Sequence, residues 1–148
     1  SGPFIPPSRM REYVFPYLAG EVAEAHRLGL PAILHSDGNV TPLLGDIVGA
    51  GFDGLHSLQP NAGVDIVDTK KRWGDRLCLM GNLDLDYLLT LGRPEEVEAE
   101  VRRLMREVAP GGGYILSTTN VLTRYTPPEN ALAMYRAAQQ FGKYPMRT

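Results

Sequence analysis

The feature that most constrains the fold is an alternation of short apolar runs with longer amphipathic segments, repeated four times along the chain. The apolar runs are expected strands at residues 32–35, 53–57, 77–80 and 114–116. Each is followed by a segment in which apolar residues recur every three or four positions, the spacing of a helix. Apolar strands that alternate with helices pair in parallel and need cover on both faces. The sequence therefore predicts an α/β protein with a parallel sheet.

Five helices are expected around these strands, at residues 9–28, 41–50, 61–73, 94–108 and 127–141. In the first helix, Pro16 is expected to bend or split the helix, since proline removes a backbone hydrogen bond. The fourth helix has the clearest amphipathic pattern, because Val97, Val101 and Leu104 fall on one face with charged residues between them.

Two architectures fit this alternation. One is an open doubly wound sheet, and the other is part of a (β/α)8 TIM barrel, which takes about 250 residues. Four strand–helix units in 148 residues amount to about half of such a barrel. No glycine-rich phosphate-binding fingerprint follows any of the strands. Its absence makes the open doubly wound sheet less favoured than the barrel. In both architectures the functional residues gather at the carboxyl ends of the strands.

Composition narrows the class of partner. The net charge of −2 gives no indication of nucleic acid as a partner, and no apolar run approaches the roughly 18 residues of a membrane span. The single cysteine, Cys78, lies in an apolar run and is expected to be a buried, inert thiol. The start, Ser1-Gly2-Pro3, has no signal-peptide pattern. These features together predict a cytoplasmic protein with neither nucleic acid nor membrane as partner.

Polar side chains follow every expected strand. The residues predicted to do chemistry are His35, Asp37 and His56, because imidazoles exchange protons near neutral pH and a carboxylate stabilises positive charge. The residues predicted to contact substrate are Asn39, Gln59, Asn82, Asp84, Thr119, Asn120 and Arg124.

Each candidate also has a structural interpretation. Asp37 and Asn39 have the residue types of a turn or a helix cap, and Asn82 and Asp84 equally suit a cap of the following helix. His35 and His56, each taken alone, could equally be buried histidines whose ring nitrogens form hydrogen bonds inside the protein. Arg124 suits a solvated loop, and is otherwise placed to hold an acidic substrate with a bidentate contact.

The sequence offers one possible set of ligands for a divalent metal ion such as zinc. His35, Asp37 and His56 together have the composition of a two-histidine, one-carboxylate set. Nothing in their spacing demands a metal, and the sole cysteine gives no support to a thiolate zinc site. No metal ligand is therefore assigned, and the expected enzyme uses no cofactor.

The ordered motifs resemble the carboxy-terminal half of the uroporphyrinogen decarboxylase family along essentially the whole chain. They read PFIPPSRMREYVFPYL, PAILHSDGN, GFDGLHSLQP, DIVDTKKRWGDRLCLMGNLD and APGGGYILSTTNVLTRYTPPENALAMYRAAQQFGKYP. The resemblance implies a (β/α)8 barrel, of which residues 1–148 form one domain, the carboxy-terminal half. The family contains cofactor-free decarboxylases of tetrapyrrole acetate side chains and zinc-dependent methyltransferases that act between corrinoids and thiols.

The chain departs from both of these chemistries. The arginines and the principal aspartate of the decarboxylase belong to the amino-terminal half, and Asn120 stands near the place of a histidine in its last loop. The methyltransferases carry a His-x-Cys pair, and here Asp37 replaces that cysteine, while their later cysteine falls near Thr118 or Thr119. Neither of the two known sets of functional residues is therefore complete in this chain.

Three functions follow as expectations. The first is a lyase that removes carboxyl groups from a tetrapyrrole or another small acidic substrate, active only when the barrel is completed by its amino-terminal half. The second is a corrinoid- or thiol-dependent methyltransferase with an altered metal set. The third is a non-catalytic half-barrel whose open strand edges pair with a second copy.

Overall fold

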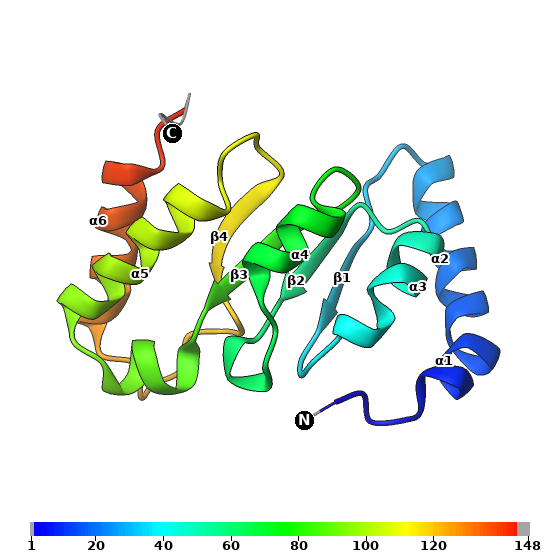
Figure 1. Cartoon of the computed structure of the whole chain (residues 1–148), viewed down its shortest axis with the longest axis horizontal. Helices are drawn as coiled ribbons and strands as arrows, with labels where there is room; N and C mark the ends of the chain where they lie inside the picture. Colours follow the sequence, from blue (N-terminus) through cyan, green and yellow to red (C-terminus); the bar gives the residue numbers. More distant parts are fainter. Residues whose placement is uncertain (1, 145–148) are drawn as a thin grey trace.

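Four parallel strands form one sheet in the order β1-β2-β3-β4 in the computed structural model, which describes residues 2–144 (Figure 1). The strands are β1 (Ile33–Ser36), β2 (Gly54–Ser57), β3 (Cys78–Leu83) and β4 (Tyr114–Thr118). Every crossover moves the chain one strand further in the same direction, as in a TIM barrel, whereas a doubly wound sheet reverses its order. The expected α/β fold is confirmed, and the strand order favours the half-barrel.

Residues 2–144 also form six α-helices and three shorter helical turns, which precede, connect and follow the strands. The helices are α1 (Pro7–Tyr13), α2 (Phe15–Arg27), α3 (Leu44–Gly49), α4 (Ile66–Trp73), α5 (Pro94–Glu107) and α6 (Pro128–Phe141). The turns are η1 (Thr41–Leu43), η2 (Pro60–Ala62) and the π-helical η3 (Leu85–Leu89). In Figure 1, α3 and α4 lie in front of the sheet, while α2 and α6 flank its two ends.

The expected helices at 9–28 and 61–73 differ most from their predicted bounds. The helix expected at 9–28 is split at Val14, and Pro16 stands in the first turn of α2, where its missing N–H costs nothing. The helix expected at 61–73 begins only at Ile66, because the Asp65 carboxylate accepts hydrogen bonds from the backbone N–H groups of Val67 and Asp68.

The third strand is longer than expected, and η3 was not predicted. The apolar run ends at Met80, yet the pairing of β3 with β4 continues through Asn82 opposite Ser117 and Leu83 opposite Thr118. Pairing with a neighbouring strand, rather than side-chain polarity, sets this boundary.

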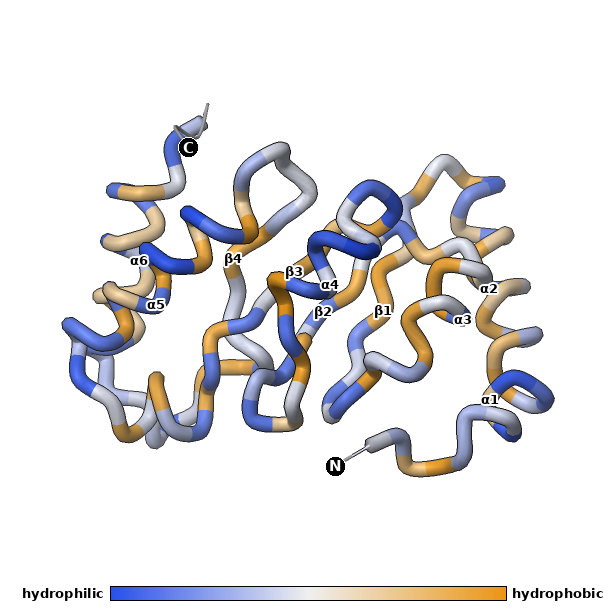
Figure 2. The backbone as a smooth tube through the Cα atoms, viewed as in Figure 1, coloured by the Kyte–Doolittle hydropathy of each residue, from blue (hydrophilic) through white to orange (hydrophobic). Residues whose placement is uncertain are grey.

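The sheet has one covered and one uncovered face within residues 2–144. Leu55 and Leu79, in one register row, are fully buried against the helices. On the opposite face Ile33 and Ile115 are each about half exposed, at 48% and 47%. The expectation that both faces are covered is therefore wrong for the part of the chain described, because all of its helices pack on one side of the sheet or at its ends. Figure 2 shows hydrophobic residues along parts of β1 and β3 and hydrophilic stretches along α4 and α5.

The beginnings of β1 and β2 are joined by Asp53. Its carboxylate Oδ2 accepts a hydrogen bond from the Ala32 N–H at 2.7 Å and lies 2.8 Å from His26 Nε2. The backbone hydrogen bond, with the contact to His26 next in size, lowers the pKa of Asp53 below its ordinary value of 3.8. Asp53 thus stabilises the folded chain in its ionised form.

The Asp53→Asn variant should therefore be less stable than the unchanged chain at neutral pH, with the difference shrinking under acid conditions. A lowered folded-state pKa gives stability that is fully present above the unfolded value of 3.8 and is lost as pH falls through the folded value. Urea unfolding of both chains across this range measures the difference. A difference that stays constant down to strongly acid pH would contradict the role of the ionised carboxylate.

Candidate active site at the carboxyl ends of the strands

The parallel register places His35 directly opposite His56. The two residues are partners in the pairing of β1 with β2, and side chains of one register row project from the same face of a parallel sheet. Met80 and Ile115 continue this row across β3 and β4. The histidines therefore lie on the uncovered face, close to the carboxyl edge of the sheet.

The two imidazoles contact each other through their Nδ1 atoms, which are 2.7 Å apart, with ring centroids separated by 4.8 Å. His56 also uses its second nitrogen: Nε2 lies 3.1 Å from the carbonyl oxygen of Thr118 and 3.3 Å from the hydroxyl of Ser117. His35 keeps Nε2 directed toward Asp37, at 3.6 Å from Oδ1. That distance is longer than a hydrogen bond but suits an ion pair when His35 is protonated.

Asp37 connects three strand ends. Its carboxylate accepts a hydrogen bond from the Ser57 hydroxyl at 3.2 Å and contacts the Asn120 side-chain amide nitrogen at 3.2 and 3.4 Å. Asp37 follows β1, Ser57 ends β2, and Asn120 follows β4. About half of the Asp37 side chain remains exposed, so a bound molecule can still reach the carboxylate.

The chain turns sharply at the end of β2. Ser57 and Leu58 both have positive φ, at 92° and 53°, a region that residues other than glycine rarely adopt. Ser57 is nonetheless fully buried, and its hydroxyl reaches Asp37. Strained backbone of this kind is held by its surroundings and concentrates at functional sites.

The structure brings together four of the predicted residues, His35, Asp37, His56 and Asn120. With Ser57 and Ser117 they form one group of polar side chains, which we call the edge cluster. The two serines are not among the residues predicted to react or to contact substrate, although both belong to the polar residues at strand ends. Their position in that pattern is the signal that marks them.

The loop candidates Asn39 and Gln59 brace the chain beside the edge cluster. Gln59 Oε1 accepts a hydrogen bond from the Gly38 N–H at 2.5 Å. Asn39 Oδ1 accepts from the Thr41 N–H at 3.0 Å, which makes it a turn residue.

The remaining candidates make no side-chain hydrogen bond to the edge cluster within residues 2–144. Asn82 is almost fully buried, and its amide nitrogen donates to the Leu58 carbonyl. Asp84 caps η3, since its carboxylate accepts from three successive N–H groups. Thr119 is buried, and Arg124 stacks over the ring of Tyr125, to whose hydroxyl it also donates. The contacts of Asn82, Asp84 and Arg124 are structural, and contacts of all four residues with substrate stay predictions.

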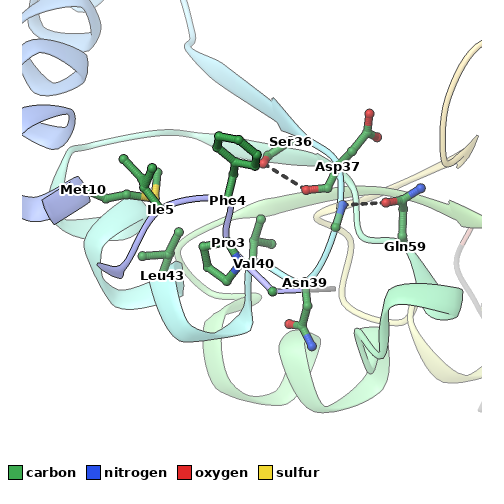
Figure 3. A pocket seen from close by; sticks show the side chains of 12 residues that line it. Pro3, Phe4, Ile5, Met10, Ser36, Asp37, Asn39, Val40, Leu43 and Gln59 are labelled. Carbon is green, nitrogen blue, oxygen red and sulfur yellow. Dashed lines mark hydrogen bonds between the residues drawn. The ribbon is translucent and has the colours of Figure 1, made fainter. Parts of the chain in front are cut away.

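A cavity of about 460 Å³ adjoins the loop that follows β1 (Figure 3). One side is apolar and the other carries polar residues of the loop; the lining residues are Gly2, Pro3, Phe4, Ile5, Met10, Ser36, Asp37, Gly38, Asn39, Val40, Leu43 and Gln59. In Figure 3 the Asp37 carboxylate points away from Phe4 and Ile5. The cavity therefore offers an apolar surface for the body of a ligand, with the charged group at its rim.

No group of three His, Cys, Asp or Glu side chains within residues 2–144 is arranged to hold a metal ion. The set of His35, Asp37 and His56 does not form one, because His56 has both ring nitrogens engaged inside the protein. Cys78 is half-buried rather than buried, and desolvation raises the pKa of its thiol, which disfavours the reactive thiolate. The helices of the described residues include none that is long and apolar enough to cross a membrane.

Comparison with known proteins defines the family. The sequence profile described as "Uroporphyrinogen decarboxylase (URO-D)" matches residues 1–141, so the chain belongs to the uroporphyrinogen decarboxylase family. A uroporphyrinogen decarboxylase from Methylobacillus flagellatus is 32% identical over 109 residues, which are 69% of this chain and 30% of that protein. One from Coxiella burnetii is 28% identical over 144 residues, 95% of this chain and 38% of that protein.

A solved structure has the same fold. A methyltransferase from Methanosarcina mazei superimposes with a TM-score of 0.78 at 26% identity, covering 94% of this chain and 39% of that protein. The chain thus spans well under half the length of each relative. The resemblance predicted from the sequence motifs is confirmed at the level of family and fold.

The assignment of Asp84 as a helix cap is testable. The Asp84→Ala variant should lose about 1 kcal/mol of unfolding free energy, because three N–H groups at the start of η3 lose their acceptor. Asp84→Asn, which keeps an acceptor oxygen, is the matched control and should stay close to the unchanged chain. Equal losses in both variants by urea denaturation would point to a role for the charge rather than for capping.

Proposed function

We propose that the chain is the carboxy-terminal half of a uroporphyrinogen decarboxylase-like barrel, in which the edge cluster transfers a proton during loss of CO2 from a small acidic substrate such as a tetrapyrrole carboxylate. The observation that carries the proposal is the array of His35, Asp37 and His56 at the carboxyl edge, where barrel enzymes place their active sites. Membership of the family supports the class of reaction.

Decarboxylation needs a proton donor. The bond between the side-chain carbon and its carboxylate breaks, CO2 leaves, and the electron pair remains on carbon until a proton arrives there. Protonated His35 is placed to supply that proton from Nε2, and it recovers a proton from solvent after turnover. Asp37, 3.6 Å away, stabilises the imidazolium before transfer and any positive charge that develops on the substrate.

Binding of the substrate carboxylates needs permanent cations such as arginine or lysine, and the edge cluster contains neither residue type. Arg124 is the arginine in the loop after β4, and its guanidinium lies 4.8 Å above the Tyr125 ring. We assign it a peripheral contact at most, and assign the main carboxylate contacts to the amino-terminal half. Asn39 and Gln59 then shape the loop beside the substrate, and the adjoining cavity accepts an apolar part of it.

Replacement of the proton-transfer pair in the complete barrel should abolish most of the turnover without unfolding the protein. His35→Gln and Asp37→Asn should each lower kcat by roughly 10²- to 10⁴-fold, the usual contribution of general acid catalysis. Asp68→Asn, an exposed carboxylate on α4, is the matched control and should leave kcat unchanged. Undiminished decarboxylation in both site variants would remove the edge cluster from the mechanism.

A methyltransferase function is the second candidate, favoured by the solved methyltransferase of the same fold. His35 Nε2 and the Asp37 carboxylate would supply two ligands to a zinc ion, which would bind and activate the accepting thiol. This function predicts stoichiometric zinc in the purified complete protein, measured by elemental analysis, and its loss in the His35→Gln variant. A metal-free protein that is active would contradict it.

A third candidate is a self-associating half-barrel without catalysis, supported by the uncovered sheet face with Ile33 and Ile115 exposed. Two copies pairing at their open edges would close an eight-stranded sheet. The chain mass is 16.3 kDa, so light scattering after size exclusion should give about twice this value. A monomer would leave the amino-terminal half of the barrel as the proposed cover of this face.

A further inference from the structure

We infer that His56 is a positioning residue that fixes the tautomer of His35, so that Nε2 is the atom of His35 that gains and loses the proton. The inference deepens the proposed function, on which its catalytic meaning rests. It follows from the hydrogen-bonding partners of the two rings, which leave few ways to distribute the protons.

The first step concerns His56 Nε2. Its nearest partner is the carbonyl oxygen of Thr118 at 3.1 Å, and a carbonyl only accepts hydrogen bonds. His56 Nε2 therefore carries a hydrogen. The Ser117 hydroxyl at 3.3 Å is a second acceptor for the same N–H.

The second step concerns the contact between the rings. A neutral imidazole carries one N–H, so His56 Nδ1 presents a lone pair. The Nδ1 atoms are 2.7 Å apart, which requires one hydrogen between them, and that hydrogen belongs to His35. His35 is thus the Nδ1–H tautomer, and its Nε2 is the bare nitrogen.

The third step concerns the charge beside that nitrogen. Asp37 Oδ1 lies 3.6 Å from His35 Nε2 and is also held by Ser57 and Asn120. A proton arriving at Nε2 therefore forms an ion pair in place, without movement of either side chain. The groups facing the histidine pair are Asp37 after β1, Ser57 on β2, and Ser117 with the Thr118 carbonyl on β4. Among them only Asp37 is charged.

One other proton arrangement satisfies the ring contact. In it the Ser117 hydroxyl donates to His56 Nε2, His56 Nδ1–H donates to His35, and His35 carries its hydrogen on Nε2. That arrangement sets the His56 Nε2 lone pair against the Thr118 carbonyl oxygen at 3.1 Å, which is repulsive in a half-buried position. The first arrangement sets the bare Nε2 of His35 near Asp37 Oδ1, but that contact is longer, at 3.6 Å, and about half exposed to solvent. The closer repulsion at Thr118 therefore decides for the first arrangement, and the two are distinguishable by experiment.

Ring nitrogens with and without hydrogen have well-separated ¹⁵N chemical shifts. Long-range ¹H–¹⁵N correlation on the histidine-labelled 148-residue chain, at a pH where both rings are neutral, should show hydrogen on His35 Nδ1 and on His56 Nε2. Hydrogen on His35 Nε2 would overturn the inference, whatever the activity of the protein.

Two variants separate positioning from packing. His56→Asn keeps an acceptor oxygen near the position of Nδ1, so His35 should remain the Nδ1–H tautomer. His56→Leu removes the acceptor, and His35 should shift toward the Nε2–H form that free histidine favours. The dispersion of the amide spectrum reports whether each variant folds, and if the leucine variant does not, the unchanged chain and the asparagine variant still decide. A His35 tautomer that is the same in the folded leucine variant as in the unchanged chain would overturn the inference.

Turnover separates this inference from the proposed function. If the tautomers are as inferred but His35→Gln leaves decarboxylation by the complete protein unchanged, the proposed function fails while the arrangement of protons stands. If His35→Gln abolishes turnover but His35 carries its hydrogen on Nε2, the function survives and the positioning role of His56 does not.

Discussion

Parallel pairing of the strands in one register is the interaction on which the rest of this structure depends. It sets His35 opposite His56 and brings the ends of β1, β2 and β4 to the same edge. Asp37 then reaches Ser57 and Asn120, and Asn120 is 83 residues further along the chain. A shift of β1 by one residue would turn His35 to the helix-covered face and separate the two imidazoles.

The same pairing explains why one face of the sheet lacks cover. Each crossover returns the chain on the same side, so the helices gather over Leu55 and Leu79 and leave the row of His35, His56 and Met80 open. In a closed barrel that row faces the interior, where side chains of the other strands fill the space. The sequential strand order and the family membership fit this interpretation, and the chain spans 30–39% of the length of the three relatives compared above.

Much of this fold is predictable from the residues, because apolar strands and amphipathic helices carry strong periodic patterns. The sequence also predicts that polar residues gather at the strand ends. This pattern identified His35, Asp37, His56 and Asn120 as candidates. Their mutual contacts are not predictable from spacing, since they depend on the register of strands 21 residues apart. Capping is the main source of ambiguity: Asp84 has the residue type of a substrate contact, but three N–H groups of η3 occupy its carboxylate.

The central claim is that the ends of three strands meet in one polar cluster, and nuclear Overhauser spectroscopy of this chain tests it most directly. Cross-peaks should join the Asn120 side-chain amide protons to the β-protons of Asp37, and the ring protons of His35 to those of His56. Their presence would establish the convergence of β1, β2 and β4 on which the proposed chemistry rests. Their absence, in a spectrum that shows the backbone pairing of β1 with β2 and of β3 with β4, would contradict the cluster while leaving the sheet intact.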